Sequence, residues 1–285
     1  MADPTTSQKY QHSLGSFELE SPLKKLRWSS SSTLFLSVIL SVIALVIIVW
    51  WPLVEDYARY FDPRFPLWMQ IDWLLVGIFL FMSILITIGA DLRKDAILVV
   101  VGLIGGFLIE SWGTHTGLWA YYTGEKPPLW ILPAWPIAAL AIERMARLAG
   151  IIRLRISEQL EKALYTLVFG GFIIYMLAFI RPTLAHPFTI LAFAGVMIIS
   201  LSSGNRRYDL VTFISGAALG YFLETWGTTR ECWTYYTLQK PPFFAILAHG
   251  LASVAFWRLT KLGESILKVL VLKVLNRQYN NPAHR

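Results

Sequence analysis

The chain has 285 residues, of which 55% are hydrophobic and only 15% are charged, and its formal net charge is +7. A soluble domain carries about 25% charged residues, so this composition excludes an ordinary soluble protein. The apolar residues occur in blocks of about twenty, the length that a helix needs to cross about 30 Å of hydrocarbon. They do not alternate with polar residues, as they would in the strands of a membrane β-barrel. The single cysteine, Cys232, excludes a disulfide framework.

The N-terminal segment, residues 1–30, is polar and rich in serine, and we expect it to be loosely ordered and cytoplasmic. The first apolar block follows without a small-residue cleavage site, so it is predicted to be a retained span rather than a signal peptide. About eight transmembrane helices are predicted, over residues 34–54, 67–89, 96–112, 127–143, 163–180, 184–203, 209–226 and 241–257. The predicted fold class is therefore an all-α integral membrane protein.

Lysine and arginine are distributed unequally between the two sides of this predicted membrane protein. With eight spans, both termini and the even-numbered loops lie on one side, which holds most of the basic residues. The other side holds only Arg59, Arg64, Lys126, Arg181, Arg230 and Lys240. Basic loops stay in the cytoplasm, so both termini are predicted to be cytoplasmic, in a bacterial or archaeal plasma membrane. The charge then orients the chain in the bilayer, and no nucleic-acid partner is expected.

Two segments of the chain align without a gap at an offset of 114 residues, from Arg93 with Arg207 to Arg144 with Arg258. Other identities are Asp95/Asp209, Gly102/Gly216, Gly106/Gly220, Glu110/Glu224, Trp112/Trp226, Trp119/Trp233, Tyr121/Tyr235 and Tyr122/Tyr236. Such a match indicates duplication. We therefore predict two four-helix repeats, residues 31–150 and 151–260. Four spans separate the copies, so the repeats are parallel and related by a pseudo-two-fold axis along the membrane normal.

The third predicted helix of each repeat has the form Gly-x3-Gly-x3-Glu-x3-Thr, which places all four residues on one face. Small residues four apart let two membrane helices approach closely. Our hypothesis is that the helices bearing Gly106 and Gly220 lie near the axis, with Glu110 and Glu224 close by, toward the outer leaflet. An ionisable residue at that depth faces the bundle interior, where a neutral carboxylic acid can donate or accept a proton. Alternatively, each glutamate bonds to Trp or Tyr and only fixes the following loop.

Asp72 and His186 are a second candidate polar pair, because the same offset places both near the outer ends of their spans. Two interpretations remain open for them. They share a polar pocket with the glutamates, or they are solvated at the membrane interface. The first interpretation makes both residues candidates for ligand binding.

The outer loops are rich in aromatic residues, with the pattern Trp-Gly-Thr-x4-Trp-x-Tyr-Tyr-Thr-x2-Lys-Pro-Pro. Trp and Tyr favour the level of the lipid headgroups, so an aromatic belt is one explanation. The other is that these side chains cap an apolar cavity or stabilise a carbocation over their π-faces. The aromatic residues predicted to bind ligand are Trp112, Trp119, Tyr121, Tyr122, Trp226, Trp233, Tyr235 and Tyr236. No pair of histidines has metal-ligand spacing, so neither a metal nor a cofactor is predicted.

Two further features are predicted to be structural. The motifs that begin at Arg93 and Arg207, each Arg-x-Asp, are typical of the start of a helix. The tail, residues 261–285, mixes apolar and basic residues from Leu262 to Gln278, which favours an amphipathic helix lying along the cytoplasmic membrane surface.

One motif resembles a known family. The run acid-x6-Gly-x-Trp-x-Tyr, formed here by Glu110, Gly117, Trp119 and Tyr121, resembles the lycopene cyclase domain of carotenoid biosynthesis. The second copy carries the same run, with Glu231 in place of the glycine. The stretch Glu-x2-Gly-Thr-x2-Gly is also similar to membrane carotenoid hydratases. In the cyclase family a small helical unit likewise occurs twice in one chain or as two subunits.

The chain departs from the cyclase pattern in the next helix, where the family carries Pro-x-Glu-Glu. Here the sequence reads Pro-Ala-Trp-Pro at residues 133–136 and Leu-Ala-His-Gly at residues 247–250, without an acid. The resemblance therefore implies acid–base chemistry that rests on Glu110 and Glu224, as proton donor and acceptor. It also implies a long hydrophobic isoprenoid or other lipid as the ligand, held between the two copies.

Two other functions are compatible with the same residues. A proton-coupled transporter would use the glutamates as ion sites between its repeats. A non-catalytic subunit or assembly factor would use its Trp-rich loops and its C-terminal helix to bind partner membrane proteins. In all three cases the chain is surrounded by the lipid bilayer.

Overall fold

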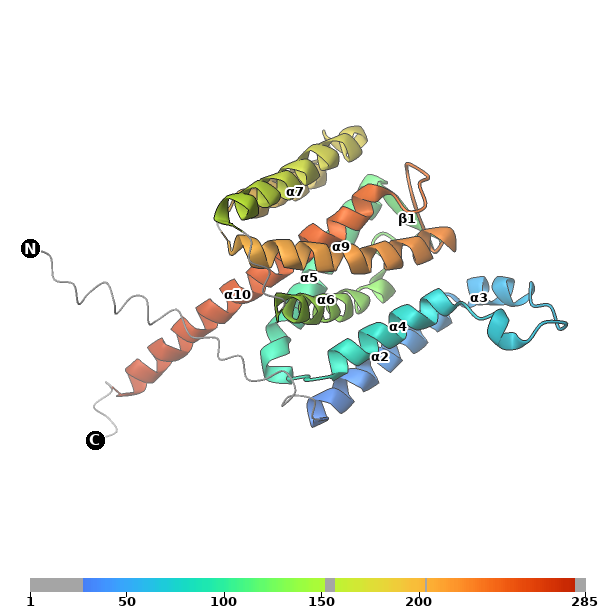
Figure 1. Ribbon diagram of the computed structural model, residues 1–285, viewed down its shortest axis with the longest axis horizontal. Coiled ribbons are helices and arrows are strands. Elements are labelled where there is room, and N and C mark those ends of the chain that lie inside the picture. Colours follow the sequence, from blue (N-terminus) through green and yellow to red (C-terminus); the bar gives the residue numbers. More distant parts are fainter. Residues whose placement is uncertain (1–27, 152–156, 203, 280–285) are drawn as a thin grey trace, which may run out of the picture.

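The computed structural model describes residues 28–151, 157–202 and 204–279, so most of the predicted N-terminal segment 1–30 lies outside the described residues. The chain is predominantly helical, as predicted (Figure 1). The α-helices are α2 (Ser30–Val49), α3 (Trp51–Ala58), α4 (Trp73–Thr87), α5 (Leu92–Thr116), α6 (Ala134–Ile151), α7 (Glu158–Phe179), α8 (Pro187–Leu201), α9 (Arg206–Thr229) and α10 (Phe243–Tyr279). Short 3-10 turns cover Leu67–Met69 (η2), Leu129–Ile131 (η3) and Arg181–Thr183 (η4), and two strands cover Trp119–Tyr121 (β1) and Trp233–Tyr235 (β2).

Each of the eight predicted apolar blocks coincides with helical structure, but the helices are not all of the length needed to cross a membrane. Among the described residues, five helical stretches are long and apolar enough to cross a membrane: Ser30–Val49, Leu92–Thr116, Leu129–Gly150, Glu158–Phe179 and Phe243–Lys273. The helices α4 and α8 have only 15 residues each. The first predicted block is divided into α2 and α3 at Trp50, and Pro52 stands in the first turn of the second helix.

The helices begin where the sequence supplies capping side chains. The side chain of Asp72 accepts a hydrogen bond from the backbone N–H of Leu75 at 3.2 Å, and so caps α4. His186 caps α8 in the same way, because its Nδ1 accepts from the backbone N–H of Phe188 at 3.2 Å. Such caps satisfy backbone donors that the first turn leaves unpaired.

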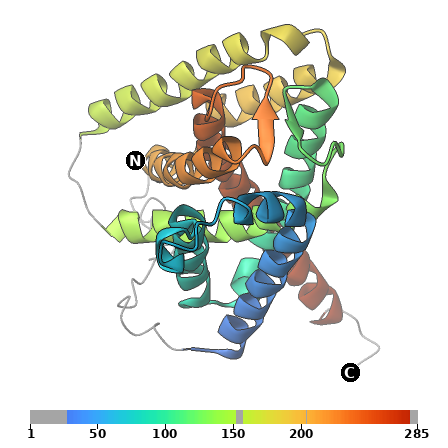
Figure 2. The same cartoon turned by 90° about the vertical axis from the view of Figure 1, so that its right-hand side faces the viewer.

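The helices form three groups across the molecule (Figures 1 and 2). The pair α2 and α4 lies along one edge and α7 lies along the opposite edge, with α6, α9 and α10 between them. Within the centre, α5 packs against α6, and α9 packs against α10 along much of its length. The helix α4 reaches across to α9, and α8 reaches across to α5. The start of α2 and the end of α10 lie toward one end of the molecule, while α3 and the strands lie toward the other.

Two ion pairs with buried aspartates join the central helices at the end where α5 and α9 begin. Arg144 Nη2 lies 2.7 Å from Asp95 Oδ2, and Arg258 Nη2 lies 2.7 Å from Asp209 Oδ2. All four residues belong to the identities at the 114-residue offset. A buried charge is tolerated only with such a partner. The aspartates of the Arg-x-Asp motifs therefore fix α5 to α6 and α9 to α10.

The glycine face of each glutamate-bearing helix contacts the next helix of its own segment. A Cβ placed on Gly102 would lie 3.0 Å from the Cα of Pro136, and one on Gly106 would overlap the Trp135 ring. On Gly220 it would lie 2.5 Å from the Cβ of His249. The expected close approach therefore occurs, but it joins α5 to α6 and α9 to α10 rather than α5 to α9.

The tail differs from its prediction. The segment from Leu262 onward continues the same unbroken helix that begins at Phe243, whereas we expected a separate helix lying along the membrane surface. The physical reason is packing at Gly263, the position where a break is easiest. A Cβ there would lie 3.1 Å from Ile97 Cγ2 of α5, and Lys261 pairs with Glu264 at 2.9 Å. Residues 280–285 lie outside the described part of the chain.

Candidate functional site

The two strands form a small sheet that joins the aligned segments. They are antiparallel, with Trp119 opposite Tyr235, Ala120 opposite Thr234 and Tyr121 opposite Trp233. Ala120 and Thr234 are themselves 114 residues apart, so the centre of the sheet pairs equivalent positions. Side chains two residues apart point to the same face of a strand. The Trp-x-Tyr spacing therefore directs both aromatic side chains of each strand toward one glutamate.

Glu110 is almost fully buried, with 3% of its surface exposed, and three aromatic donors surround its carboxylate. Trp119 Nε1 donates to Oε2 at 3.0 Å. The Tyr121 hydroxyl donates to Oε1 at 2.9 Å, and Trp135 Nε1 donates to the same oxygen at 3.1 Å. These four residues are called the first half-site below.

Glu224 has nearly the same environment, with 4% of its surface exposed. Trp233 Nε1 donates to Oε2 at 2.9 Å, and the Tyr235 hydroxyl donates to Oε1 at 2.9 Å. The third partner is different, because His249 Nε2 lies 3.1 Å from Oε1. These four residues form the second half-site.

The half-sites lie against one another through their aromatic rings. The pairs Trp119/Tyr235 and Tyr121/Trp233 each have ring centroids 5.8 Å apart. Trp135 and His249 are stacked, with centroids 5.7 Å apart and ring planes 17° from parallel. These two residues are also equivalent at the 114-residue offset. The two glutamates therefore belong to one continuous aromatic cluster.

Two glycines make room for the indoles that bind the glutamates. A Cβ on Gly113 would overlap the outer ring of Trp119, and one on Gly227 would overlap Trp233 in the same way. The threonine of the helical motif has a different role, because Thr114 Oγ1 donates to the backbone carbonyl of Glu110 at 2.6 Å. The glycine just before the motif's threonine thus makes room for an indole ring, while the threonine itself satisfies the helix backbone.

An apolar cavity of about 850 Å³ reaches both carboxylates. It lies between α5, α7, α8 and α10, and the two strands close its inner end. Leu108 and Leu191 stand at its rim with 61% and 69% of their surfaces exposed, so the cavity opens to the side of the helix bundle. Among the described residues that line it, none is a lysine or an arginine. Pockets of this size accept organic ligands rather than single ions.

The cavity depends on small residues of α8. Ala192 and Gly195 line it, and at the same offset α4 carries Ile78 and Phe81. Ile78 is buried, and α4 packs against α6 along much of its length. By contrast, α8 meets α10 at few positions. The smaller side chains of α8 leave space at the cavity, whereas Ile78, at the equivalent position of α4, is packed into the bundle.

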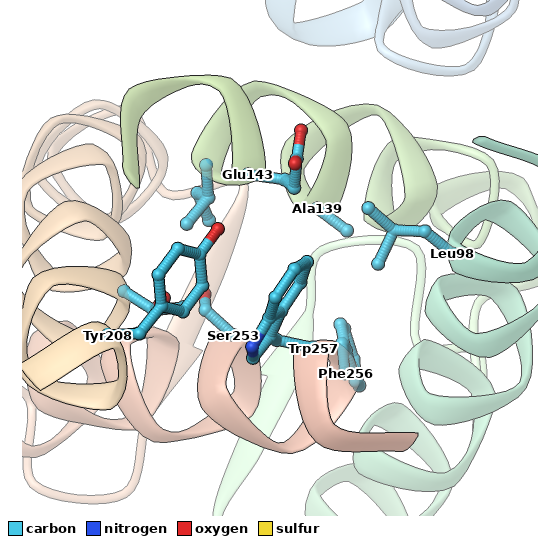
Figure 3. Close-up of a pocket in the computed structure, with 9 residues that line it drawn as sticks. Leu98, Ala139, Glu143, Tyr208, Ser253, Phe256 and Trp257 are labelled. Atoms are coloured by element: carbon cyan, nitrogen blue, oxygen red, sulfur yellow. The ribbon is translucent and has the colours of Figure 1, made fainter. Parts of the chain in front are cut away.

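A second, much smaller cavity of about 10 Å³ lies among α5, α6, α9 and α10 (Figure 3). Tyr208, Ser253 and Trp257 surround it, and the Glu143 carboxylate points away from them. Thr212 Oγ1 also lines it and has no hydrogen-bond partner. This volume is near the minimum for one water molecule, so it excludes an organic ligand.

The predicted ligand-binding residues divide into two groups. Those that line the large cavity with the glutamates are Trp112, Trp119, Tyr121, Trp233 and Tyr235. Those that do not line it are Asp72, Tyr122, His186, Trp226 and Tyr236. Four of the second group join helices or loops: Trp226 Nε1 donates to Asp72 at 2.9 Å, the Tyr122 hydroxyl donates to the Val49 carbonyl, and Tyr236 donates to the Phe179 carbonyl at 2.6 Å. His186 only caps α8, so the structure does not bring it and Asp72 into a pocket with the glutamates.

Sequence reasoning missed two residues of the site, Trp135 and His249. Both stand in the runs Pro-Ala-Trp-Pro and Leu-Ala-His-Gly, at the place where the cyclase motif carries its acids. Two signals identify them. The 114-residue offset pairs Trp135 with His249. Each also packs over a glycine of the neighbouring helix, Gly106 for Trp135 and Gly220 for His249. A residue that packs over a helix glycine lies beside the glutamate one turn further along that helix.

The site offers no group of three or more His, Cys, Asp or Glu residues that could hold a metal, within the described ranges. Cys232 lies in the loop before β2 and is 1% exposed. Burial raises the pKa of its thiol to about 12, so it stays protonated and unreactive at neutral pH.

No protein-family model, curated protein or solved structure matches the chain. The resemblance to the lycopene cyclase domain therefore rests on the quoted motif alone.

Proposed function

We propose that the chain spans the membrane eight times as two parallel four-helix repeats related by a pseudo-two-fold axis. Ala120 pairs with Thr234, and Trp135 stacks on His249, and the two members of each pair are 114 residues apart. Equivalent residues of two copies touch only where a two-fold axis passes between them. The distribution of basic residues supports cytoplasmic termini.

The proposed ligand is an elongated apolar molecule of the isoprenoid or carotenoid class. The cavity is apolar, opens to the side of the bundle and has room for an organic chain of this kind. A ligand dissolved in the bilayer can enter it sideways between α5 and α8, past Leu108 and Leu191. The resemblance to carotenoid enzymes supports the same class of ligand.

The proposed reaction is an acid–base isomerisation or ring closure. One glutamic acid gives its proton to a carbon of a C=C bond, whose π electrons form the new C–H bond and leave a cation on the neighbouring carbon. In a ring closure, the π electrons of a second C=C bond of the same ligand first attack this cation, which forms the new C–C bond and moves the cation to another carbon. In either case the other glutamate removes a proton from a carbon adjacent to the cation, and that C–H electron pair forms a new C=C bond. No co-reactant is consumed. The faces of Trp119 and Trp233 stabilise the cation in between.

The observation that carries this proposal is the contact of one apolar cavity with both buried carboxylates. Glu110 and Glu224 are 3% and 4% exposed, yet both line the cavity. Buried acids in a water-poor membrane site are expensive and are retained mainly where they act. A cavity that reached neither carboxylate would support a proposal of ligand binding but not one of acid–base catalysis.

The test uses the full chain in lipid nanodiscs with two probes, lycopene and geranylgeraniol. Binding is measured by quenching of tryptophan fluorescence, and conversion by chromatography with mass spectrometry. Glu110→Gln and Glu224→Gln should each lower conversion by about 10²-fold or more while retaining binding. Glu231→Gln is the matched control, because Glu231 is exposed and pairs with Lys240 outside the cavity.

Three outcomes contradict parts of the proposal. Full conversion by both Gln variants contradicts acid–base catalysis by the glutamates. Binding of either probe without conversion by the unchanged chain contradicts the enzyme and leaves a lipid-binding protein. Failure to bind either probe contradicts the isoprenoid class.

One observation favours a second candidate, a non-catalytic membrane-complex subunit. Each carboxylate has three hydrogen-bond partners inside the protein, which tie its helix to a strand and to the next helix. If that is their whole role, the Gln variants lower the unfolding temperature and change no apolar metabolite. Tight co-purification with partner membrane proteins would then be expected.

A further inference from the structure

The two half-sites differ in one hydrogen-bonding group. Glu110 and Glu224 each bind one indole N–H and one tyrosine hydroxyl at nearly equal distances. The third partner is the indole of Trp135 in the first half-site and the imidazole of His249 in the second. The other two hydrogen-bond partners of each carboxylate are matched. The third partner is therefore the difference that can give the two glutamates different roles in proton transfer.

An indole and an imidazole have different capacities for a proton. The indole N–H only donates a hydrogen bond and cannot take a proton from a carboxylic acid or return one. An imidazole nitrogen can donate or accept, and exchanges a proton with a carboxylate at hydrogen-bond distance. His249 Nε2 and Glu224 Oε1 are 3.1 Å apart, so a proton can move between these two atoms.

The surroundings of His249 provide for either protonation state. Its ring stacks on Trp135, whose π-face attracts a positive imidazolium. Gly220 of α9 lets the ring lie flat against the helix, because a Cβ there would lie 2.5 Å from the His249 Cβ. On its own helix, Ser253 Oγ donates to the His249 carbonyl at 2.6 Å and leaves the ring free to face Glu224.

No stronger base competes for this proton among the described residues that line the cavity. The ionisable side chains facing it from α5, α9, α10 and the two strands are Glu110, His115, Tyr121, Glu224, Tyr235 and His249. His115 stands at the rim, where it is exposed and its Nδ1 lies 2.8 Å from the Ser111 carbonyl. His249 is therefore the basic group that touches a buried glutamate.

We infer that Glu224 and His249 together form the proton-donating pair of the site, and that Glu110 is the proton-accepting carboxylate. This assignment deepens the proposed function and rests on it. Glu224 Oε1–H breaks as the ligand carbon gains the proton, and the imidazolium Nε2–H then restores the proton to Glu224. Glu110 gains the proton that the ligand loses. When the product has left, Glu110 gives this proton to water and His249 takes one up from water, which returns both groups to their starting states. The indoles of Trp119 and Trp135 and the hydroxyl of Tyr121 hold the Glu110 carboxylate ready to receive it.

The first experiment needs no substrate and measures the pair itself. The full chain, labelled with ¹⁵N-histidine, is examined by solid-state NMR in lipid, and His249 is assigned from the signal lost in His249→Gln. The Nε2–H signal shifted by a strong hydrogen bond should vanish in Glu224→Gln and persist in Glu110→Gln. The pairing is overturned if the shifted signal persists in Glu224→Gln. It is also overturned if the signal is lost only in Glu110→Gln.

The second experiment exchanges the differing residues between the half-sites. His249→Trp gives both glutamates an indole, and conversion of lycopene should fall about 10²-fold or more while fluorescence shows unchanged binding. The double variant Trp135→His with His249→Trp moves the imidazole to Glu110 and should restore part of the activity.

The outcomes separate this inference from the proposed function. If His249→Trp keeps full activity while both Gln variants are inactive, the acid–base function stands and the assigned pair is wrong. If the unchanged chain converts neither probe but the NMR signal depends on Glu224, the pair exists and the reaction is wrong. If His249→Trp loses ligand binding, His249→Gln serves as a second variant, because its side chain is smaller than tryptophan. Loss of ligand binding in both variants overturns a specific role of His249 in proton transfer.

Discussion

At the scale of single residues, the site depends on positions where only a hydrogen atom fits. Gly113 and Gly227 lie against the indoles that bind the glutamates, and a methyl group on either would overlap a ring. Backbone shape imposes a second demand at the helix ends. Gly117 adopts φ +73° and its equivalent Glu231 adopts φ +58°, both in the left-handed region. The same chain path is thus kept although glycine is present in only one copy.

The glycine contact leads to a prediction about stability. Gly113→Ala should lower the free energy of unfolding by about 1–3 kcal/mol, because the new methyl group must displace the Trp119 ring. Gly170→Ala in α7 is the matched control, since nothing lies within 4 Å of a Cβ at that position. The control should be neutral or slightly stabilising, as alanine favours a helix over glycine. Thermal unfolding in detergent measures both, and equal unfolding temperatures would contradict the overlap.

The left-handed positions give a prediction of opposite sign for the two copies. Glu231→Gly should stabilise the chain by about 1 kcal/mol, because a non-glycine residue pays that much in this conformation. Gly117→Glu should destabilise it by a similar amount. The ion pair of Glu231 with Lys240 is exposed and contributes little. Lys240→Ala serves as the control for the loss of this ion pair. The prediction would be contradicted if Glu231→Gly destabilised the chain more than Lys240→Ala does.

The residues of the site were predictable where the chain keeps them close. Glu110, Trp119 and Tyr121 lie within twelve residues of one another at the end of one helix and the start of one strand, so local geometry brings them together. Trp135 comes from the next helix, and its contact depends on how α6 rotates against α5. Helix periodicity identifies a face but not its partner. That is why Trp135 and His249 emerged only from the packed structure.

At the scale of elements, the difference between α4 and α8 determines on which side of the bundle the large cavity lies. Both helices have 15 residues and both begin at a side-chain cap. The sequence predicted a helix at each place, because apolar blocks and caps are local signals. It did not predict the continuous α10 or the split between α2 and α3. The continuity of α10 involves tertiary packing, such as the contact of Gly263 with Ile97, whereas Pro52 stands in the first turn after the α2/α3 split.

Filling the cavity from α8 should abolish ligand binding. Gly195→Phe introduces the residue that α4 carries at the same offset, and its Cβ meets no atom within 4 Å. We expect quenching by geranylgeraniol to fall at least tenfold with the unfolding temperature unchanged, because the ring occupies the ligand's place. Gly171→Phe is the matched control, on the exposed side of α7 and outside the cavity. Unchanged binding in Gly195→Phe would contradict the assignment of the cavity to the ligand.

The buried ion pairs should act as clamps between helices. Arg144→Met leaves the Asp95 carboxylate buried at 5% exposure without its main partner, which should cost about 3–5 kcal/mol of stability. Arg59→Met is the control, because Arg59 pairs with Glu55 while 68% of its side chain is exposed, and it should cost about 1 kcal/mol or less. Chemical unfolding in detergent distinguishes the two. Equal costs would mean that the Asp95 contact does not hold α5 to α6.

At the scale of the whole molecule, the two ends of the bundle have different chemistry. The ion pairs of Asp95 and Asp209 mark the end where α5 and α9 start, and the strands and α3 mark the other end (Figure 1). Most basic residues belong to the first end in the predicted topology. A bilayer orients such a chain with its basic end in the cytoplasm. In this proposed orientation the cavity and the glutamates would lie nearer the outer leaflet.

This orientation can be measured with single cysteines in a Cys232→Ser background. Arg64→Cys should react with a membrane-impermeant maleimide in intact cells, because its loop is predicted to face outward and its side chain is 83% exposed. Lys94→Cys, whose side chain is 74% exposed at the start of α5, should react only after the membrane is permeabilised. The unchanged chain is the control: its buried Cys232, with a pKa of about 12, should react only on unfolding. The reverse pattern would place the glutamates near the cytoplasmic leaflet, and labelling of both sites in intact cells would contradict a membrane between them.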